Sequence, residues 1–304
     1  MGNLTTMNEF LLVVLTGDRL ILYILFAVFL LIYMKTLLLN FLIIFLVITD
    51  RHLHTPMYFF LGNLAFLDMS YSTVTAPRMI HDFVSTNPSI SFLSCMTQIY
   101  FFIHFASSEI LLLAVMSYDR YVAICHPLHY IPIMSWKVCV QLSSMVWVLG
   151  FFYALTHTLC LLRLTFCNIN IIHNFFCDLP HLLQISCTDT FINFLVLLTV
   201  GGSLGLVAFV VTFHPYTHIF SAIIRIPTSD GKLKAFSTCT SHLAVVFIFY
   251  GSLVFIYLVP TTSSLVLVSV IYSVINPLLN PLIYSVRNND LKAALRRVLH
   301  HSML

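Results

Sequence analysis

The sequence predicts an all-α membrane protein, a bundle of seven spanning helices followed by a short amphipathic helix. The chain is 60% hydrophobic and only 8% charged, with a mean hydropathy of +0.98, whereas a soluble domain is usually about 45–50% apolar and about 25% charged. Its apolar runs are long and unbroken, as in LILYILFAVFLLIYMKTLLLNFLIIFLVI at residues 20–48. A spanning helix needs roughly 20 such residues, whereas barrel strands alternate over about 10. Only helices satisfy every backbone group within such a run.

Seven spans are predicted along the chain. Their expected limits are 22–48, 57–80, 95–120, 138–160, 191–224, 236–259 and 265–285. The fifth is too long for one crossing, so its last turns are expected to project into water. The segment RNNDLKAALRRVLHH at 287–301 places leucine and alanine at helical spacing among charges, which is typical of an amphipathic helix on the membrane surface. With no internal repeat, residues 1–304 are expected to form a single domain.

The distribution of lysine and arginine predicts the orientation. With the N-terminus outside, the inner loops and tail hold Arg51, Arg120, Lys137, Arg225, Lys232, Lys234, Arg287, Lys292, Arg296 and Arg297. The outer side holds only Arg19, Arg78 and Arg163. We therefore expect a multi-pass plasma-membrane protein with residues 1–21 extracellular and 286–304 cytoplasmic, and with the first span itself directing insertion. The basic inner face suits anionic lipid and not nucleic acid.

Two features of the expected outer side fit an oxidising compartment. Asn3-Leu4-Thr5 is an N-x-[ST] acceptor, so Asn3 is predicted to be glycosylated. Cys95, Cys167, Cys177 and Cys187 also lie outside, which predicts two disulfides and leaves three pairings open. The other four cysteines, in or near the spans or on the inner side, are expected to be free thiols: Cys125, Cys139, Cys160 and Cys239.

Polar residues within spans are costly and need an explanation. Asp68, Glu109 and Asn280 fall in the second, third and seventh spans. Hydrogen bonds between helices are one explanation. For the two carboxylates, a bound cation such as sodium and a protonated carboxyl are the further alternatives. Pro277 and Pro281 each remove a backbone donor from the seventh span, which favours either a switch between two kinked arrangements or a merely bent helix.

An acid and a base stand side by side where the third span should reach the cytoplasm. Asp119 and Arg120 lie within MSYDRYVAICHPLHY at 116–130. An arginine at this depth costs little if it pairs with the adjacent acid or reaches the interface. Physical chemistry alone is equally compatible with a static anchor and with a functional pair.

Four motifs resemble those of odorant receptors, within the rhodopsin-like G protein-coupled receptors. They are MSYDRYVAICHPLHY, LHTPMYFFLGNLAFLD at 53–68, KAFSTCTSHL at 234–243 and NPLIYSVRNNDLKAAL at 280–295. Their order and expected side of the membrane match the family over nearly the whole chain. HPLHY and the long outer loop resemble the tetrapod-type class.

This resemblance implies a receptor that binds a small volatile odorant and activates a stimulatory G protein to raise cAMP. Arg120 would pair with Asp119 at rest and engage the G protein when freed. The other residues implied in this switch are Tyr121, Asn280, Pro281 and Tyr284, together with the segment 234–242. Asp68 and Glu109 match the family's sodium site. The implied disulfides are Cys95–Cys177 and Cys167–Cys187.

The resemblance also places the ligand among spans three, five, six and seven. In span three, counting helical turns from Arg120 gives four residues that would line the pocket: Phe102, Ile103, Ala106 and Ser107. In span six, helical spacing within FYGSLVFIY gives four more: Tyr250, Leu253, Val254 and Tyr257. Ordinary helix packing would give the same pattern. Ser107 and Tyr257 are the candidates for the one or two hydrogen bonds that a mostly apolar pocket needs.

Three residues depart from the family pattern. Leu39 stands where a glycine usually precedes the asparagine of span one, Lys35 lies near the middle of that span, and Pro215 replaces a serine of span five. Lysine at that depth costs about 2.5–3.5 kcal/mol unless it reaches the interface or a polar cavity. These departures predict reduced folding and trafficking. His214 and His218 share a helix face, which leaves a metal pair as a weaker alternative.

Competing classes fit the sequence less well. A transporter would be expected to show inverted repeats and broken helices, and a channel a continuous polar face. An enzyme is not expected, since no H-E-x-x-H or glycine-rich phosphate loop occurs. A receptor copy that barely traffics or signals is the remaining alternative.

Overall fold

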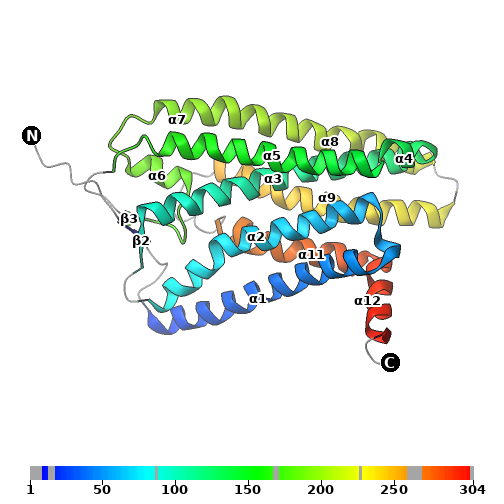
Figure 1. Ribbon diagram of the computed structural model, residues 1–304, viewed down its shortest axis with the longest axis horizontal. Coiled ribbons are helices and arrows are strands. Elements are labelled where there is room, and N and C mark those ends of the chain that lie inside the picture. Colours follow the sequence, from blue (N-terminus) through cyan, green and yellow to red (C-terminus); the bar gives the residue numbers. More distant parts are fainter. Residues whose placement is uncertain are drawn as a thin grey trace, which may run out of the picture.

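A computed structural model describes residues 9–12, 18–85, 88–166, 171–225, 228–258 and 269–301. The described residues form seven long helical segments, which run side by side in an elongated bundle (Figure 1). The first four are α1 (Arg19–Thr49), α2 (Pro56–Val84), α3 (Phe92–Cys125) and α5 (Trp136–Leu161). The fifth consists of α7 (Phe191–Val196), the π-helical turn η3 (Leu197–Gly201) and α8 (Gly202–Arg225). The sixth is α9 (Ser229–Leu258), and the seventh is the π-helical turn η4 (Ile271–Ile275) followed by α11 (Asn276–Arg287).

The two ends of the bundle carry different short elements (Figure 1). The outer end, as we call it, carries the strands β1 (Glu9–Leu12), β2 (Ser89–Ser91) and β3 (Ile171–Ile172) and the helix α6 (Leu179–Ile185). The inner end carries η1 (Arg51–Leu53), η2 (Pro127–His129), α4 (Tyr130–Ile133) and α12 (Asn289–His301). The predicted seven-helix bundle with a C-terminal amphipathic helix is confirmed.

The spanning helices differ in how apolar they are. Four of the described helices are long and apolar enough to cross a membrane: Arg19–Thr49, Phe92–Cys125, Trp136–Leu161 and Phe191–Arg225. Helix α2 is less apolar because its buried face carries Asp68, Ser72 and Thr75. Such polar side chains are tolerated in a membrane when they face the protein interior, so the weaker apolar signal of α2 reflects its place inside the bundle.

Prolines affect the helices in different ways. Helix α8 continues through Pro215 and α11 through Pro281. Pro277 is the second residue of α11 and follows the π-helical turn η4 without a break, so it lies inside the continuous seventh span. The irregularity of the seventh span is the π-helical turn η4 directly before it. Irregular turns of this kind are common at functional sites.

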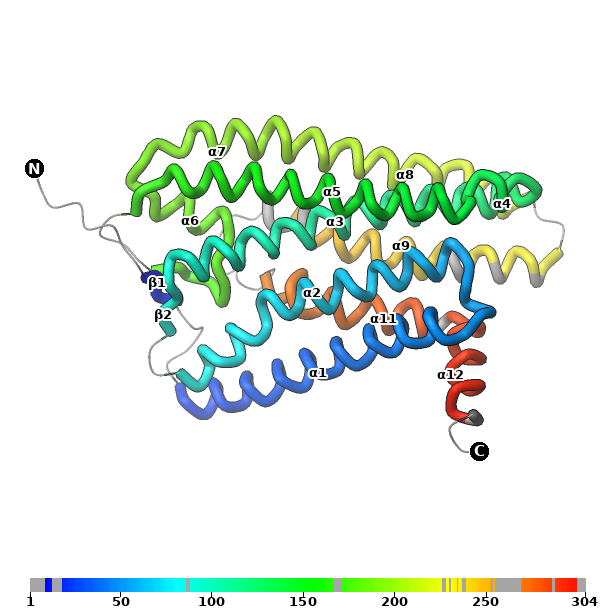
Figure 2. The backbone as a smooth tube through the Cα atoms, in the orientation of Figure 1, coloured from blue at the N-terminus to red at the C-terminus, as the bar shows by residue number. Residues whose placement is uncertain are grey.

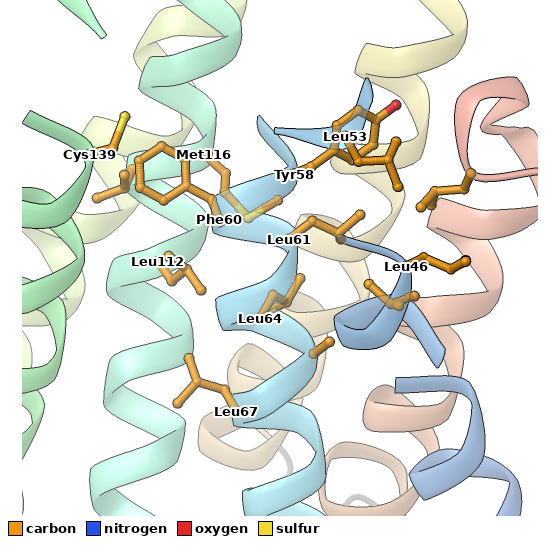
Figure 3. Close-up of a cluster of buried hydrophobic side chains, with 14 of the residues drawn as sticks. Leu46, Leu53, Tyr58, Phe60, Leu61, Leu64, Leu67, Leu112, Met116 and Cys139 are labelled. Atoms are coloured by element: carbon orange, nitrogen blue, oxygen red, sulfur yellow. The ribbon is translucent and has the colours of Figure 1, made fainter. Parts of the chain in front are cut away.

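A cluster of buried side chains fixes the inner half of the bundle (Figure 3). Leu64 and Leu67 of α2 lie opposite Leu112 of α3. Leu291 and Ala294 of α12 are buried in the same cluster. The inner ends of α2 and α3 are thereby held in fixed register, which positions Asp119 and Arg120 about two turns beyond Leu112 along α3.

Helix α12 turns away from the bundle direction (Figure 2) and is anchored by polar contacts. Arg297 Nε donates to Asp50 Oδ2 at 2.8 Å, and the Tyr58 hydroxyl lies 3.0 Å from both Asn288 Oδ1 and Asp290 Oδ2. Burial alone would raise the pKa of Asp50, but hydrogen bonds from the His52 amide and Arg297 lower it to about 2. Asp50 therefore stays charged and keeps its hold on the C-terminal helix.

The outer end contains a small sheet that the sequence analysis did not predict. Strand β1 lies between β2 and β3, antiparallel to β2 and parallel to β3. Phe10 and Leu12 alternate with more exposed neighbours and are fully buried. The Phe10 ring packs edge-on against Phe166, with 5.2 Å between ring centroids. Because Phe10 and Leu12 are buried among residues of α3 and the outer loops, strand β1 is fixed to the outer end of the bundle.

Gly150 permits the close contact between α3 and α5. A Cβ atom on Gly150 would overlap Ser108 Oγ and lie 3.1 Å from the carbonyl oxygen of His104. We expect Gly150→Ala to destabilise the protein by about 1–3 kcal/mol through overpacking, seen as a lower thermal unfolding midpoint of the purified protein. Adding Ser108→Ala removes the overlapping hydroxyl and should restore part of the loss. Equal unfolding midpoints for parent and Gly150→Ala would show that the helices separate at little cost.

Candidate functional site

Asp119 and Arg120 form an ion pair at the inner end of α3. The Arg120 guanidinium donates to Asp119 Oδ2, with Nε at 3.1 Å, and the Tyr130 hydroxyl donates to Asp119 Oδ1 at 2.7 Å. Asp119 is 1% exposed and Arg120 13% exposed. Tyr130 comes from α4, so the loop after α3 folds back onto the acid and helps to hold the pair.

The surroundings of Arg120 come from the fifth and sixth spans. The Tyr216 hydroxyl of α8 is hydrogen-bonded to His242 Nδ1 of α9, and both residues are buried. Arg120 interacts electrostatically with Tyr216, His242 and Cys239. The ion pair thus lies beside a direct polar contact between α8 and α9, so a movement of either helix changes the environment of Arg120.

Tyr121 faces a different direction from Arg120. Its hydroxyl lies 3.2 Å from His126 Nε2, and its ring lies 5.9 Å from the His218 ring of α8. His214 and His218 are edge to face, 5.1 Å between centroids. Within the described residues no group of three or more His, Cys, Asp or Glu side chains is arranged to hold a metal ion. Among the described residues, His214 and His218 therefore have no third side chain of these types with which to hold a metal ion.

Asn280 joins the two carboxylates that the sequence analysis singled out. Its amide nitrogen donates to Asp68 Oδ1 at 2.9 Å and to Glu109 Oε1 at 3.2 Å. All three side chains are buried. Three helices, α2, α3 and α11, are therefore linked through one amide group.

This polar centre has more hydrogen-bonding atoms than partners in the described protein. Asp68 Oδ2, Asn40 Oδ1, both amide atoms of Asn276 and the Tyr284 hydroxyl are buried without one. Asn40 Nδ2 donates to the Pro277 carbonyl at 2.9 Å, which brings α1 to the same region. Unpaired oxygens around two carboxylates are the donor set that a hard cation prefers. The residues present thus fit a sodium ion with its hydration water.

The residues expected to line the ligand pocket have different surroundings. The Phe102 ring contacts Tyr71, Phe176 and Tyr272. Tyr250 is buried, with its hydroxyl 3.3 Å from Thr212 Oγ1. Val254 is 53% exposed, so it packs against little of the protein. The side chains of Leu253 and Tyr257 lie outside the described residues.

Ser107, proposed as a hydrogen-bonding group for the ligand, is engaged within its own helix. Its hydroxyl donates to the Ile103 carbonyl at 2.7 Å and lies 3.1 Å from the His104 carbonyl. A serine that back-bonds in this way can still accept a hydrogen bond. Ile103 and Ala106 on the same face are half-buried.

The expected outer disulfides can be followed in part. Cys95 of α3 is bonded to Cys177, and both are fully buried. Cys187 is disulfide-bonded, while Cys167 lies outside the described residues, as does Asn3. The four cysteines expected to be free carry no disulfide: Cys125, Cys139, Cys160 and Cys239.

The departures in the first span have limited effects on packing. Lys35 is exposed on α1 and so faces the surroundings of the bundle, not an interior cavity. Leu39 is half-buried, and the neighbouring Asn40 still reaches the seventh span through the Pro277 carbonyl. The close approach of α1 to the seventh span is therefore kept despite the leucine.

Comparison with known proteins identifies the family. A family model described as "Olfactory receptor" matches residues 29–302. The chain belongs to the olfactory receptor family. It is 46% identical over 301 residues to "Olfactory receptor 1468" of Rattus norvegicus, a match that covers 98% of this chain and 96% of the relative. It is 44% identical to "Olfactory receptor 1C1" of Homo sapiens over 301 residues, with the same coverage of both chains.

The fold of this olfactory receptor is that of rhodopsin. Squid rhodopsin matches with a TM-score of 0.69 and 17% sequence identity, covering 93% of this chain and 81% of that one. Membership of the olfactory receptor family makes the protein a multi-pass G protein-coupled receptor and not an enzyme, and the transporter or channel alternative is not favoured. Two residues of the inner site, Tyr130 and Tyr216, were not predicted from the sequence.

Proposed function

We propose that this olfactory receptor resides in the plasma membrane with its N-terminus outside, binds a small volatile odorant within the helix bundle and activates a stimulatory G protein to raise cAMP. The observation that carries the coupling step is the buried Asp119–Arg120 pair beside the Tyr216–His242 contact. Separation of the inner ends of α8 and α9 would break that contact. Arg120 would then be free to leave Asp119 and bind the G protein.

The route from the pocket to this pair runs through the third and seventh spans. Phe102 contacts Tyr272 in the π-helical turn η4. Eight residues further along the seventh span, Asn280 bonds Asp68 and Glu109. A ligand that displaces Phe102 would bias η4, and η4 leads directly into the helix that holds the polar centre. Coupling of this kind needs a two-state element that both sites bias, and η4 is the candidate.

We also propose that the polar centre binds sodium in the resting receptor. Two carboxylates that share one amide donor repel each other, and a monovalent cation would offset that repulsion. The unpaired Asp68 Oδ2 and Asn276 side chain supply further ligands or hold its water. When bound, the ion would stabilise the arrangement of α2, α3 and α11 in which Arg120 is paired.

The test is odorant-evoked cAMP in cells that contain the olfactory stimulatory G protein. Cells would be selected for surface label on an N-terminal tag, and Arg120→Ala compared with the parent at equal surface density. We expect a broad odorant panel to evoke a response in the parent that the mutant loses. Surface-positive parent cells that stay silent to the panel, or a mutant that responds like the parent, would contradict the proposal.

A further inference from the structure

A buried polar network lies within the outer loop between α5 and α7 and reaches the seventh span. Both carboxylate oxygens of Asp178 are used: Oδ1 lies 2.6 Å from His181 Nδ1, and Oδ2 accepts from Asn174 Nδ2 at 3.1 Å. Asn174 is fully buried, and the same amide nitrogen lies 3.2 Å from Ser269 Oγ at the start of the seventh span. The chain His181–Asp178–Asn174–Ser269, which we call the outer latch, connects the loop to the seventh span.

The outer latch is also tied to two other helices. The Cys177 amide donates to Gln98 Oε1 of α3 at 2.9 Å, and Gln98 Nε2 donates to the Val74 carbonyl of α2 at 2.9 Å. Cys177 is held to α3 by its disulfide as well. The loop end of the latch is therefore rigid, so a change within the latch acts on its other end, Ser269.

His181 is the component of the latch that can change charge. It is 3% exposed, and its Nε2 atom has no hydrogen-bond partner among the described residues. The following Leu182 and Leu183 pack in the cluster that contains Cys95 and Ile99 of α3, which holds α6 in place. A buried imidazole with one nitrogen on a carboxylate and the other unpaired takes up or releases a proton with little rearrangement.

We propose that His181 and Asp178 form a binding site for extracellular protons, and that the outer latch transmits its occupancy to the seventh span. Histidine is the side chain that ordinarily titrates between pH 5 and 8. A protonated His181 would make an ion pair with the Asp178 carboxylate, in place of the hydrogen bond that a neutral imidazole donates to it. The latch would then hold the seventh span more firmly to the loop.

Among the described residues, Asp178 is the charged group whose interaction with His181 governs its protonation. Of the other titratable groups on packed elements, Tyr100 of α3 faces Phe151 of α5, and His173 is exposed. The segments 86–87, 167–170 and 259–268, outside the described residues, contain no Asp, Glu, His, Lys or Arg. Burial alone would lower the pKa of His181, but the hydrogen bond and charge of Asp178 outweigh it and raise the pKa.

The sign of the effect follows from this raised pKa. A group whose pKa is higher in the folded protein stabilises the fold fully below its unfolded pKa of about 6.5 and loses that contribution as the pH rises through the folded value. The structure has Arg120 paired with Asp119 and so has the features of a resting receptor. Protons at His181 are therefore expected to favour the resting state, which makes external acid a negative modulator.

The first experiment needs neither an odorant nor a G protein. The unfolding midpoint of purified full-length receptor in nanodiscs is measured between about pH 6 and about pH 8.5. We expect the unfolding midpoint of the parent, minus that of His181→Gln, to be larger by about 2 °C or more at the acidic end than at the alkaline end. His173 is the exposed histidine of the same loop, and His173→Gln should behave like the parent. Because the other histidines are present in both proteins, their effect on the unfolding midpoint cancels in the difference. Parallel curves for parent and His181→Gln would overturn the proton site; should His181→Gln not fold, Asp178→Asn gives the same comparison.

The second experiment rests on the proposed function and tests transmission. The cAMP response of the parent to an activating odorant is compared at external pH 6 and 8 with the cytosolic pH clamped. We expect a smaller response at pH 6 in the parent and a pH-independent response in His181→Gln. Ser269→Ala should lose the pH dependence of signalling but keep that of the unfolding midpoint. If both variants keep the pH dependence of signalling, the transmission to the seventh span is overturned. A parent that is silent at every pH would instead count against the proposed function. The proton site would in that case still be decided by the unfolding curves.

Discussion

Asp119→Asn is expected to raise the ligand-independent cAMP level per surface receptor by about 5-fold or more. The asparagine keeps the size of the side chain and can still accept from Tyr130, but it removes the negative charge that holds Arg120. Arg120 is almost fully enclosed and close to Tyr216 and Cys239. Without its partner it is an unpaired charge in a dry site, so conformations that let it reach the cytoplasm gain population.

The same argument predicts a cost in folding. Breaking a buried ion pair by removing one partner destabilises a protein by about 3–5 kcal/mol, so Asp119→Asn should reach the surface in smaller amounts. Signalling must therefore be divided by surface label. Tyr130→Phe is the matched control, because it removes one hydrogen bond to Asp119 and leaves the pair intact. A basal signal per surface receptor equal to the parent in Asp119→Asn would refute a restraining role for the pair.

The helices of this receptor and their order along the chain could be predicted from simple sequence patterns. Unbroken apolar runs define helices because no other structure satisfies the backbone in lipid. Where the helix limits fall within the described residues, they differ from the expected ones by a few residues, except for the start of α9. The expected end of the sixth span at 259 and start of the seventh at 265 lie outside the described residues. Helix α9 begins at Ser229 and not near 236, because the polar segment before the span continues the helix beyond the apolar run. Asp68, Glu109 and Asn280 could be grouped in advance because each is too polar for its span.

Contacts across loops could not be predicted in the same way. Tyr130 reaches Asp119 only because η2 and α4 fold the loop back. Pro127 and Pro132 indicate that the helix ends and the chain turns there, but they do not indicate which side chain returns to Asp119. Strand β1 is too short for its two-residue period to stand out beside so many apolar residues. Tyr216 lies in an apolar helix, where a tyrosine looks like any other buried aromatic residue. Its role could be recognised only from the structure, which shows that its hydroxyl is hydrogen-bonded to His242.

The outer disulfide is expected to have the largest effect on folding. Cys95 and Cys177 are separated by 82 residues, and closing a loop of that length restricts the unfolded chain strongly. Cys95→Ser should cost about 2–5 kcal/mol, a large share of the about 5–15 kcal/mol that stabilises a typical protein. The Gln98–Cys177 hydrogen bond would remain, but one bond of about 1 kcal/mol cannot hold the loop alone.

We expect Cys95→Ser to abolish most surface label while total protein stays detectable, since the loop would no longer cover the outer ends of α3 and the seventh span. Cys177→Ser and the double variant should behave like the single one, because each breaks the same bond. Cys160→Ser, a half-buried free cysteine near the outer end of α5, is the matched control and should reach the surface normally. If Cys95→Ser reached the surface at the parent's level, the hydrophobic packing around Phe10, Ile99 and Leu182 would have to hold the outer end without the covalent link.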